Sequence, residues 1–313
     1  MSITQSTVPT PGGPLALTDS GIETDLVFNH GIDLPEFASF PLLRQEVGRA
    51  LLETYYRAHA EVAAKHGTGF VFETPTWRSN HDWGTRLGYD QADLDAFDRD
   101  AVELVRGVRG AVPGLTGATT ISGLLGPRGD GYAVGAVMTA QESSRYHAHQ
   151  VEVFAGAGCD MVSALTMTYA AEAAGIVLAA REASMPVAVS FTVETDGRLP
   201  DGTSLRDAVR AVDEATEGYA AYLGINCAHP DHVRAAVADG GSWTERISWL
   251  RANASRQSHA ELDAAEVLDD GDPVEFAAGC ADLRASFPRM TVVGGCCGTD
   301  VRHVRALADA IVG

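Results

Sequence analysis

The sequence predicts an α/β protein, a single (β/α)8 TIM barrel that occupies residues 1–313. Short apolar runs alternate with longer amphipathic segments eight times along the chain, as in a closed parallel barrel. A length of 313 residues suits such a barrel. No Gly-x-Gly-x-x-Gly turn follows the first apolar run, which disfavours an open sheet that binds a dinucleotide. We therefore expect one domain, with no linker or low-complexity tract.

The predicted strands are short apolar runs that end at glycine or polar residues. In chain order they are 15–18, 70–74, 116–121, 160–165, 187–192, 221–226, 246–250 and 290–294. The predicted helices carry apolar residues three or four positions apart. In chain order they are 43–66, 91–110, 139–157, 170–183, 204–216, 230–238, 273–286 and 300–311. Functional side chains are expected at the carboxyl ends of the strands, where barrels of this kind place their chemistry.

Composition excludes several classes of function. A net charge of -19 argues against binding to nucleic acid or to an anionic membrane surface. The sequence has no apolar run of membrane-spanning length, and its start lacks a basic segment followed by an apolar one, so we expect a cytoplasmic protein. Lys65 is the only lysine and falls within a predicted helix, which disfavours Schiff-base chemistry.

The cysteines mark the most informative strand ends. Cys296 and Cys297 lie between glycines directly after the last predicted strand, and Cys227 ends the sixth. Adjacent cysteines do not readily form a disulfide with each other, and an odd total of five suits reduced thiols or a metal site. Catalytic zinc takes three protein ligands and keeps a fourth position open, so these three cysteines are predicted metal ligands. Cys159 and Cys280 fall in helical patterns and are expected to pack.

A site of three thiolates favours a particular chemistry. Its net negative charge makes zinc a poor activator of water, but the metal still lowers the pKa of an incoming thiol. The activated sulfur can attack a carbon electrophile, so the site suits alkyl transfer onto sulfur. Carboxylates at other strand ends, Asp19, Glu73 and Glu194, and the tryptophans Trp77 and Trp83 favour a cationic substrate group.

Four segments resemble the zinc-dependent homocysteine S-methyltransferase family. They are Gly-Gly-Cys-Cys-Gly-Thr at 294–299, Gly-Ile-Asn-Cys-Ala-His-Pro at 224–230, Ser-Gly-Leu-Leu-Gly-Pro at 122–127 and Asp-Ser-Gly-Ile-Glu-Thr at 19–24. The resemblance covers nearly the whole chain. It implies a barrel in which zinc on the three cysteines binds homocysteine as a thiolate. The thiolate would take a methyl group from a small sulfonium or quaternary ammonium donor, giving methionine.

The resemblance also suggests which residues contact the substrates. The predicted acceptor site comprises Asp19, Ser20, Gly21, Glu73, Thr74, Thr166, Asn226 and Asn253. Trp77 and Tyr169 are predicted to bind the donor. The chain is too short for separate folate and cobalamin domains beside a barrel, so S-methylmethionine, S-adenosylmethionine and betaine-type donors stay open. The sequence does not indicate the oligomeric state.

The sequence departs from the family pattern at two strand ends. Where the family has Phe-Glu-Thr, with a glutamate that holds the amino group of homocysteine, this chain has Ala-Leu-Thr, and Leu165 cannot accept that hydrogen bond. Glu73 stands where the family more often has asparagine, so we hypothesise that Glu73 contacts the amino group, assisted by Asp19. Asn253 and Arg256 are candidates to bind the carboxylate.

Three alternatives stay open. Leu165 allows a divergent thiol methyltransferase with an acceptor other than homocysteine. A zinc hydrolase or lyase on the same barrel would need a histidine in the ligand set, and His229 lies two residues after Cys227. A non-enzymatic redox or zinc-buffering protein would form a reversible disulfide between Cys296 and Cys297.

Overall fold

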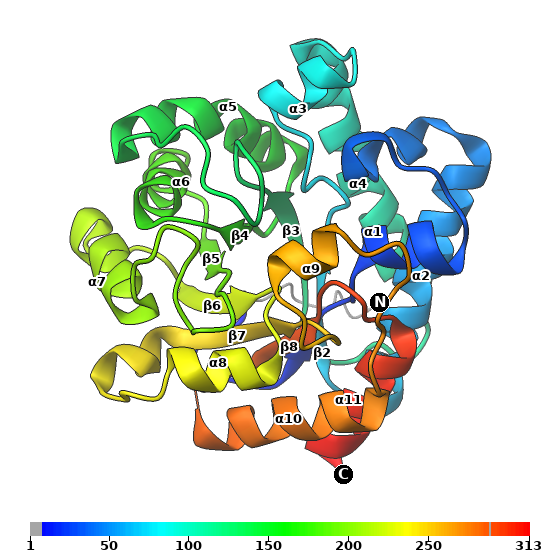
Figure 1. Cartoon of the computed structure of the whole chain (residues 1–313). Helices are drawn as coiled ribbons and strands as arrows, with labels where there is room; N and C mark the ends of the chain where they lie inside the picture. Colours follow the sequence, from blue (N-terminus) through cyan, green and yellow to red (C-terminus); the bar gives the residue numbers. More distant parts are fainter. Residues whose placement is uncertain (1–7, 288) are drawn as a thin grey trace.

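Eight parallel strands close into a barrel in the order of the chain, as the sequence predicts (Figure 1). The computed structural model describes residues 8–287 and 289–313, so the leader on which the targeting prediction rests lies largely outside the described residues. The barrel closes where Leu17 pairs with Val293. The strands are β1 Ala16–Leu17, β2 Gly69–Glu73, β3 Thr119–Leu125, β4 Met161–Met167, β5 Val187–Phe191, β6 Tyr222–Asn226, β7 Ile247–Ala252 and β8 Val292–Gly295.

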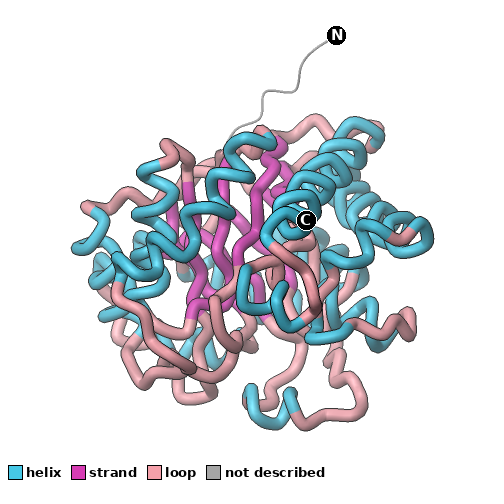
Figure 2. The backbone as a smooth tube through the Cα atoms, turned by 90° about the horizontal axis from the view of Figure 1, so that it is seen from above, coloured by secondary structure: helices cyan, strands magenta, loops and turns pink. Residues whose placement is uncertain are grey.

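All eight predicted helices are present, and they form a layer outside the strands (Figure 2). They are α2 Glu46–His66, α4 Gln91–Ala111, α5 Ala140–Ala157, α6 Ala170–Glu182, α7 Leu205–Thr216, α8 Pro230–Ala236, α10 Pro273–Ser286 and α11 Val301–Val312. Within the described part of the chain, no helix is long and apolar enough to cross a membrane.

Several short elements escaped prediction because one or two turns give too few residues for a hydrophobic period. They are α1 Ile22–Thr24, the π-helix η1 Asp25–Asn29, η2 Pro35–Phe37, η3 Phe40–Arg44, α3 His81–Arg86, η4 Ser242–Arg246 and α9 His259–Asp263. Except for η4, each follows the carboxyl end of a strand. The prediction for β3 was also displaced, because the strand continues to Leu125 through a segment assigned to a loop.

The core has two parts, and together they decide where a ligand can enter. The larger part lies between the helices and the outer face of the barrel and includes Phe70, Phe72 and Phe97. The smaller part fills the barrel interior and includes Trp249 and Leu165. Because side chains fill the interior, a ligand is confined to the carboxyl ends of the strands.

Candidate active site

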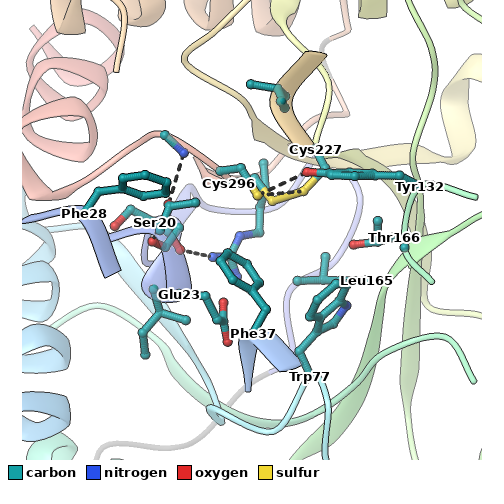
Figure 3. A pocket seen from close by; sticks show the side chains of 18 of the residues that line it. Ser20, Glu23, Phe28, Phe37, Trp77, Tyr132, Leu165, Thr166, Cys227 and Cys296 are labelled. Carbon is teal, nitrogen blue, oxygen red and sulfur yellow. Dashed lines mark hydrogen bonds between the residues drawn. A yellow bond between two sulfur atoms is a disulfide. The ribbon is translucent and has the colours of Figure 1, made fainter. Parts of the chain in front are cut away.

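A pocket of about 340 Å³ lies at the carboxyl ends of the strands (Figure 3). Its wall is formed by the loops after β1, β2 and β3, the ends of β4, β6 and β8, and the segment between β7 and α10. Nine of the predicted site residues line it: Asp19, Ser20, Gly21, Thr74, Trp77, Thr166, Cys227, Cys296 and Cys297. The strand-end rule for barrels therefore located the pocket correctly.

Three sulfur atoms meet at one side of this pocket. The Sγ atoms of Cys227, Cys296 and Cys297 all lie within 4.8 Å of one another, and those of Cys227 and Cys297 are 3.7 Å apart. Two thiolates on one tetrahedral zinc, with Zn–S bonds of about 2.3 Å, lie about 3.8 Å apart. The donor set thus fits a zinc ion once the disulfide between Cys227 and Cys296 is reduced.

That disulfide corrects one of the alternatives. The redox hypothesis paired Cys296 with Cys297, whereas the structure pairs Cys296 with Cys227 and leaves Cys297 as a free thiol. The Cα atoms of the bonded pair are 5.4 Å apart, within the ordinary range for a disulfide. The ends of β6 and β8, on either side of β7, bring these two cysteines together, which adjacency in sequence does not do for Cys296 and Cys297.

Two sharp turns and side-chain hydrogen bonds from near and far in the sequence hold the backbone around the cysteines. Cys227 has φ 50° and Gly298 φ 79°, both in the left-handed region, so each turns the chain sharply as its strand ends. Thr24 Oγ1 accepts from the Gly298 backbone N–H at 3.1 Å, and Thr299 Oγ1 donates to the Cys296 carbonyl at 2.6 Å. The segments that follow β1 and β8 are therefore joined by a hydrogen bond.

Asn226 positions the site from below the pocket and does not line it. Its Oδ1 accepts from the Thr166 backbone N–H at 2.8 Å, and its Nδ2 donates to Thr166 Oγ1 at 2.8 Å. The same amide nitrogen lies 3.8 Å from the sulfur of Cys296. Thr166 has φ 64°, so this fully buried amide fixes a sharp bend at the end of β4.

Tyr132 and His259 are site residues that sequence reasoning missed. The Tyr132 hydroxyl donates to the sulfur of Cys297 at 3.2 Å, and its ring stacks on His259 at 4.0 Å. His259 Nε2 lies 2.8 Å from the Cys227 carbonyl and its Nδ1 lies 2.8 Å from Glu194. Tyr132 comes from a loop and His259 begins the short helix α9, and neither segment has a helical or strand period long enough to mark it in the sequence.

A buried ion cluster joins the ends of β1 and β2 to β7. Arg251, on β7, pairs with Glu73 and with Asp19, whose Oδ1 is 2.8 Å from Nη2 without hydrogen-bond alignment. Its other donors bond the carbonyls of Gly295 and Ser20, at 2.8 and 2.7 Å. An arginine inside the apolar strand Ile-Ser-Trp-Leu-Arg-Ala is itself a signal for such a partner.

This cluster changes the interpretation of Glu73. Its carboxylate bonds Arg251 and accepts from Ser163 Oγ at 2.8 Å, and Glu73 is not among the described residues that line the pocket. Asp19 does line it, and burial raises the pKa of Asp19 to about 7 while Arg251 opposes that shift. The hypothesis that Glu73 contacts the amino group of homocysteine did not include a buried arginine that pairs with the Glu73 carboxylate.

The remaining predicted contacts lie away from the pocket. Tyr169 is buried before α6, and its hydroxyl accepts from the Met138 backbone N–H at 3.1 Å. Asn253 is buried behind the wall, and Arg256 is exposed and pairs with Asp231 and Glu275. Within residues 8–287 and 289–313, none of these three lines the pocket. Arg256 was the wrong choice for a carboxylate-binding residue, because surface acids neutralise it.

His229 does not join the sulfur cluster. Its Nδ1 accepts from the Asp231 backbone N–H at 3.2 Å and caps α8. The cluster of possible metal ligands found in the described part of the chain consists of the three cysteines alone. The ligand set that a zinc hydrolase would require is therefore not formed, and Cys159 and Cys280 are buried elsewhere, as expected.

Comparison with known sequences agrees with this geometry. The sequence profile described as Homocysteine S-methyltransferase matches residues 16–311. The chain belongs to this family. It is 26% identical over 272 residues to homocysteine S-methyltransferase of Escherichia coli, covering 81% of this chain and 80% of that protein. Homocysteine S-methyltransferase 4 of Zea mays is 25% identical over 214 residues, covering 65% of this chain but only 60% of the relative.

Solved structures confirm the fold. The homocysteine methyltransferase MmuM of Escherichia coli in its metallated form superposes with a TM-score of 0.73 at 21% identity, covering 95% of this chain and 96% of that one. Its oxidized form gives a TM-score of 0.72 at 22% identity, with 94% of each chain covered. The predicted barrel and the predicted membership of an S-methyltransferase family are both confirmed.

Proposed function

We propose that the protein is a zinc-dependent methyltransferase that moves a methyl group from a small sulfonium or quaternary ammonium donor to the thiolate of homocysteine. The observation that carries this proposal is the convergence of Cys227, Cys296 and Cys297 in one pocket of a barrel of this family. Bound zinc would lower the pKa of the homocysteine thiol and hold it as a thiolate at neutral pH.

The chain's own residues would hold the two substrates for an in-line displacement. The acceptor sulfur would lie beside the cysteines and attack the methyl carbon, while the bond from that carbon to the donor breaks and leaves a neutral thioether or amine. Asn226 and Thr166 keep Cys296 and the end of β4 in place. Tyr132 donates a hydrogen bond to Cys297 and orients that sulfur.

The donor's positive charge would meet aromatic faces in the same pocket. Phe28, Phe37, Trp77 and Tyr132 all line it, and a sulfonium or ammonium group is attracted to such faces by about 0.5–2 kcal/mol. Apolar side chains dominate the pocket, including Leu124, Leu165 and Leu262, and they limit water at the reacting atoms. This environment favours a bulky onium group over a strongly hydrated ammonium.

The proposal is tested by methyl transfer with purified, reduced, zinc-replete protein. Homocysteine is offered with S-methylmethionine, S-adenosylmethionine or glycine betaine, and methionine is measured. We expect turnover with at least one donor, a loss of at least about 100-fold in Cys296→Ser because one metal ligand is missing, and retained turnover in Cys159→Ser. Absence of methionine with every donor, in protein that holds one zinc, would overturn the proposal.

A further inference from the structure

Arg78 is a buried cation with a loose ion pair and with the charge of Glu23 nearby. It lies in the loop after β2, lines the pocket and is 8% exposed. Its guanidinium stacks on the rings of Trp77 and Trp83, at 4.2 and 3.7 Å from their centroids. Nη1 donates to the Gly129 carbonyl at 3.2 Å, whereas Nε is buried and has no hydrogen-bond partner among the described residues.

The nearest carboxylate does not neutralise this charge. Asp130 Oδ2 lies 3.8 Å from Arg78 Nη2, and the Asp130 side chain is 46% exposed. A loose, solvated pair of this kind contributes little, and burial lowers the pKa of Arg78. A guanidinium has five N–H donors and stays charged in proteins, so Arg78 retains capacity for a further anion.

Arg251 lines the same pocket, but its charge and hydrogen-bond donors already have partners within the protein. It forms ion pairs with two carboxylates and donates hydrogen bonds to two backbone carbonyls, so its charge and most of its donors are already used. Within the described part of the chain, Arg251 and Arg78 are the cationic side chains that line the pocket. A substrate anion would therefore find its partner at Arg78.

Glu23 supplies the complementary charge. It lies in α1, lines the pocket, and its Oε1 accepts from Ser39 Oγ at 2.7 Å. Burial raises the pKa of Glu23, and the nearby Arg251 and Arg78 guanidiniums pull it back down. Figure 3 places Glu23 on the side of the pocket where Ser20 lies, away from Leu165, which packs with Trp77 in the apolar wall.

We propose that Arg78 and Glu23 bind the two charged ends of an α-amino-acid substrate, Arg78 its carboxylate and Glu23 its ammonium group. This inference rests on the proposed function and names the residues that replace the missing acceptor at Leu165. A fork-shaped guanidinium fits a carboxylate with two parallel hydrogen bonds, and an acidic oxygen suits an ammonium group. Homocysteine and S-methylmethionine share this head group, so either the acceptor or the donor can be the ligand.

Calorimetric binding to reduced, zinc-loaded protein tests the assignment with ligands that each lack one charge. Beside L-homocysteine, the probes are 4-mercaptobutanoate, which lacks the ammonium group, and 3-aminopropane-1-thiol, which lacks the carboxylate. All three keep the thiol, so any contribution of the metal is the same for each. We expect wild-type protein to bind each truncated ligand at least about tenfold more weakly than homocysteine, because a charge-assisted hydrogen bond is lost.

The variants must respond in a crossed pattern. Arg78→Met should weaken homocysteine binding about 10- to 100-fold without changing the affinity for 3-aminopropane-1-thiol. Glu23→Gln should weaken homocysteine binding without changing the affinity for 4-mercaptobutanoate. Arg86→Met is the matched control, since Arg86 stacks on Trp83 at 4.3 Å, is 59% exposed and does not line the pocket. Its affinities should equal those of wild type.

A second arm identifies the ligand. The same variants are titrated with S-methylmethionine and with its analogue that lacks the amino group, and the amino acid that shows the crossed pattern is the one bound. Equal affinities of wild-type protein for complete and truncated ligands in both arms would overturn the inference, and this result needs no variant to fold. Failure of the proposed function would appear separately, as protein that binds the amino acid with this pattern but never produces methionine.

Discussion

The two sides of the pocket are built on opposite principles. On the β6 and β8 side, three sulfurs lie within 4.8 Å of one another, with an aromatic hydroxyl and an amide against them. On the side formed by β1, β2 and β7, Arg251 pairs with Asp19 and Glu73, which leaves little charge unpaired among these three residues. Three converging cysteines form a donor set that suits a metal ion once they are reduced, but the role of a carboxylate depends on which cation it already pairs with.

The largest effect is expected on the sulfur side. Cys297→Ser should reduce bound zinc from about one ion per chain to less than about a tenth, because two thiolates rarely hold the metal tightly. Metal analysis after dialysis of reduced protein measures this. The control is Cys159→Ser, which alters a cysteine distant from the cluster and should keep about one zinc. A Cys297→Ser protein with full zinc content would refute the three-ligand site.

On the charged side, the expected effect is on folding. Arg251→Met leaves two buried carboxylates without their cation and should lower the free energy of unfolding by about 3–5 kcal/mol. Urea denaturation at pH 7 measures the change. Arg256→Met removes an arginine with two exposed acidic partners and should cost less than about 1 kcal/mol. Equal losses in the two variants would show that the buried cluster adds no stability.

The smallest predicted effect concerns how the free energy of unfolding depends on pH. His59 lies beside the cluster, with Nε2 2.8 Å from Ser20 Oγ and Nδ1 2.8 Å from the Tyr55 carbonyl. Burial lowers the pKa of His59 to about 4. Because the unfolded side chain titrates near 6.5, its contribution to stability is complete above that pH and is lost as the pH falls towards 4.

Between pH 7 and pH 5, wild-type protein should therefore lose about 2 kcal/mol more unfolding free energy than His59→Gln. Asp19 contributes the opposite slope in this range, since its raised pKa favours the folded state at low pH, but both proteins carry it. The difference between their urea curves isolates the histidine. Parallel pH profiles would mean that His59 is protonated without penalty in the fold.

Residues with a local pattern were predicted well. The long helices and most strands follow from hydrophobic period, and the three cysteines follow from their residue type at strand ends. Residues whose role depends on a partner far away in the sequence were not predicted. Tyr132 meets Cys297 from 165 positions away, and Arg251 meets Glu73 across 178. Contacts between residues so far apart produce no pattern in a short segment of the sequence.

The sequence by itself determined the barrel, the strand ends that carry the site and the three sulfurs, because each depends on local periodicity or on the chemistry of a single residue type. Tertiary structure alone decided which charges remain available to a ligand. Glu73 is held by Arg251, while Glu23 and Arg78 line the pocket. The physical reason is that Coulomb interactions and burial act across space, so the state of an ionisable group is set by neighbours that only the closed barrel assembles.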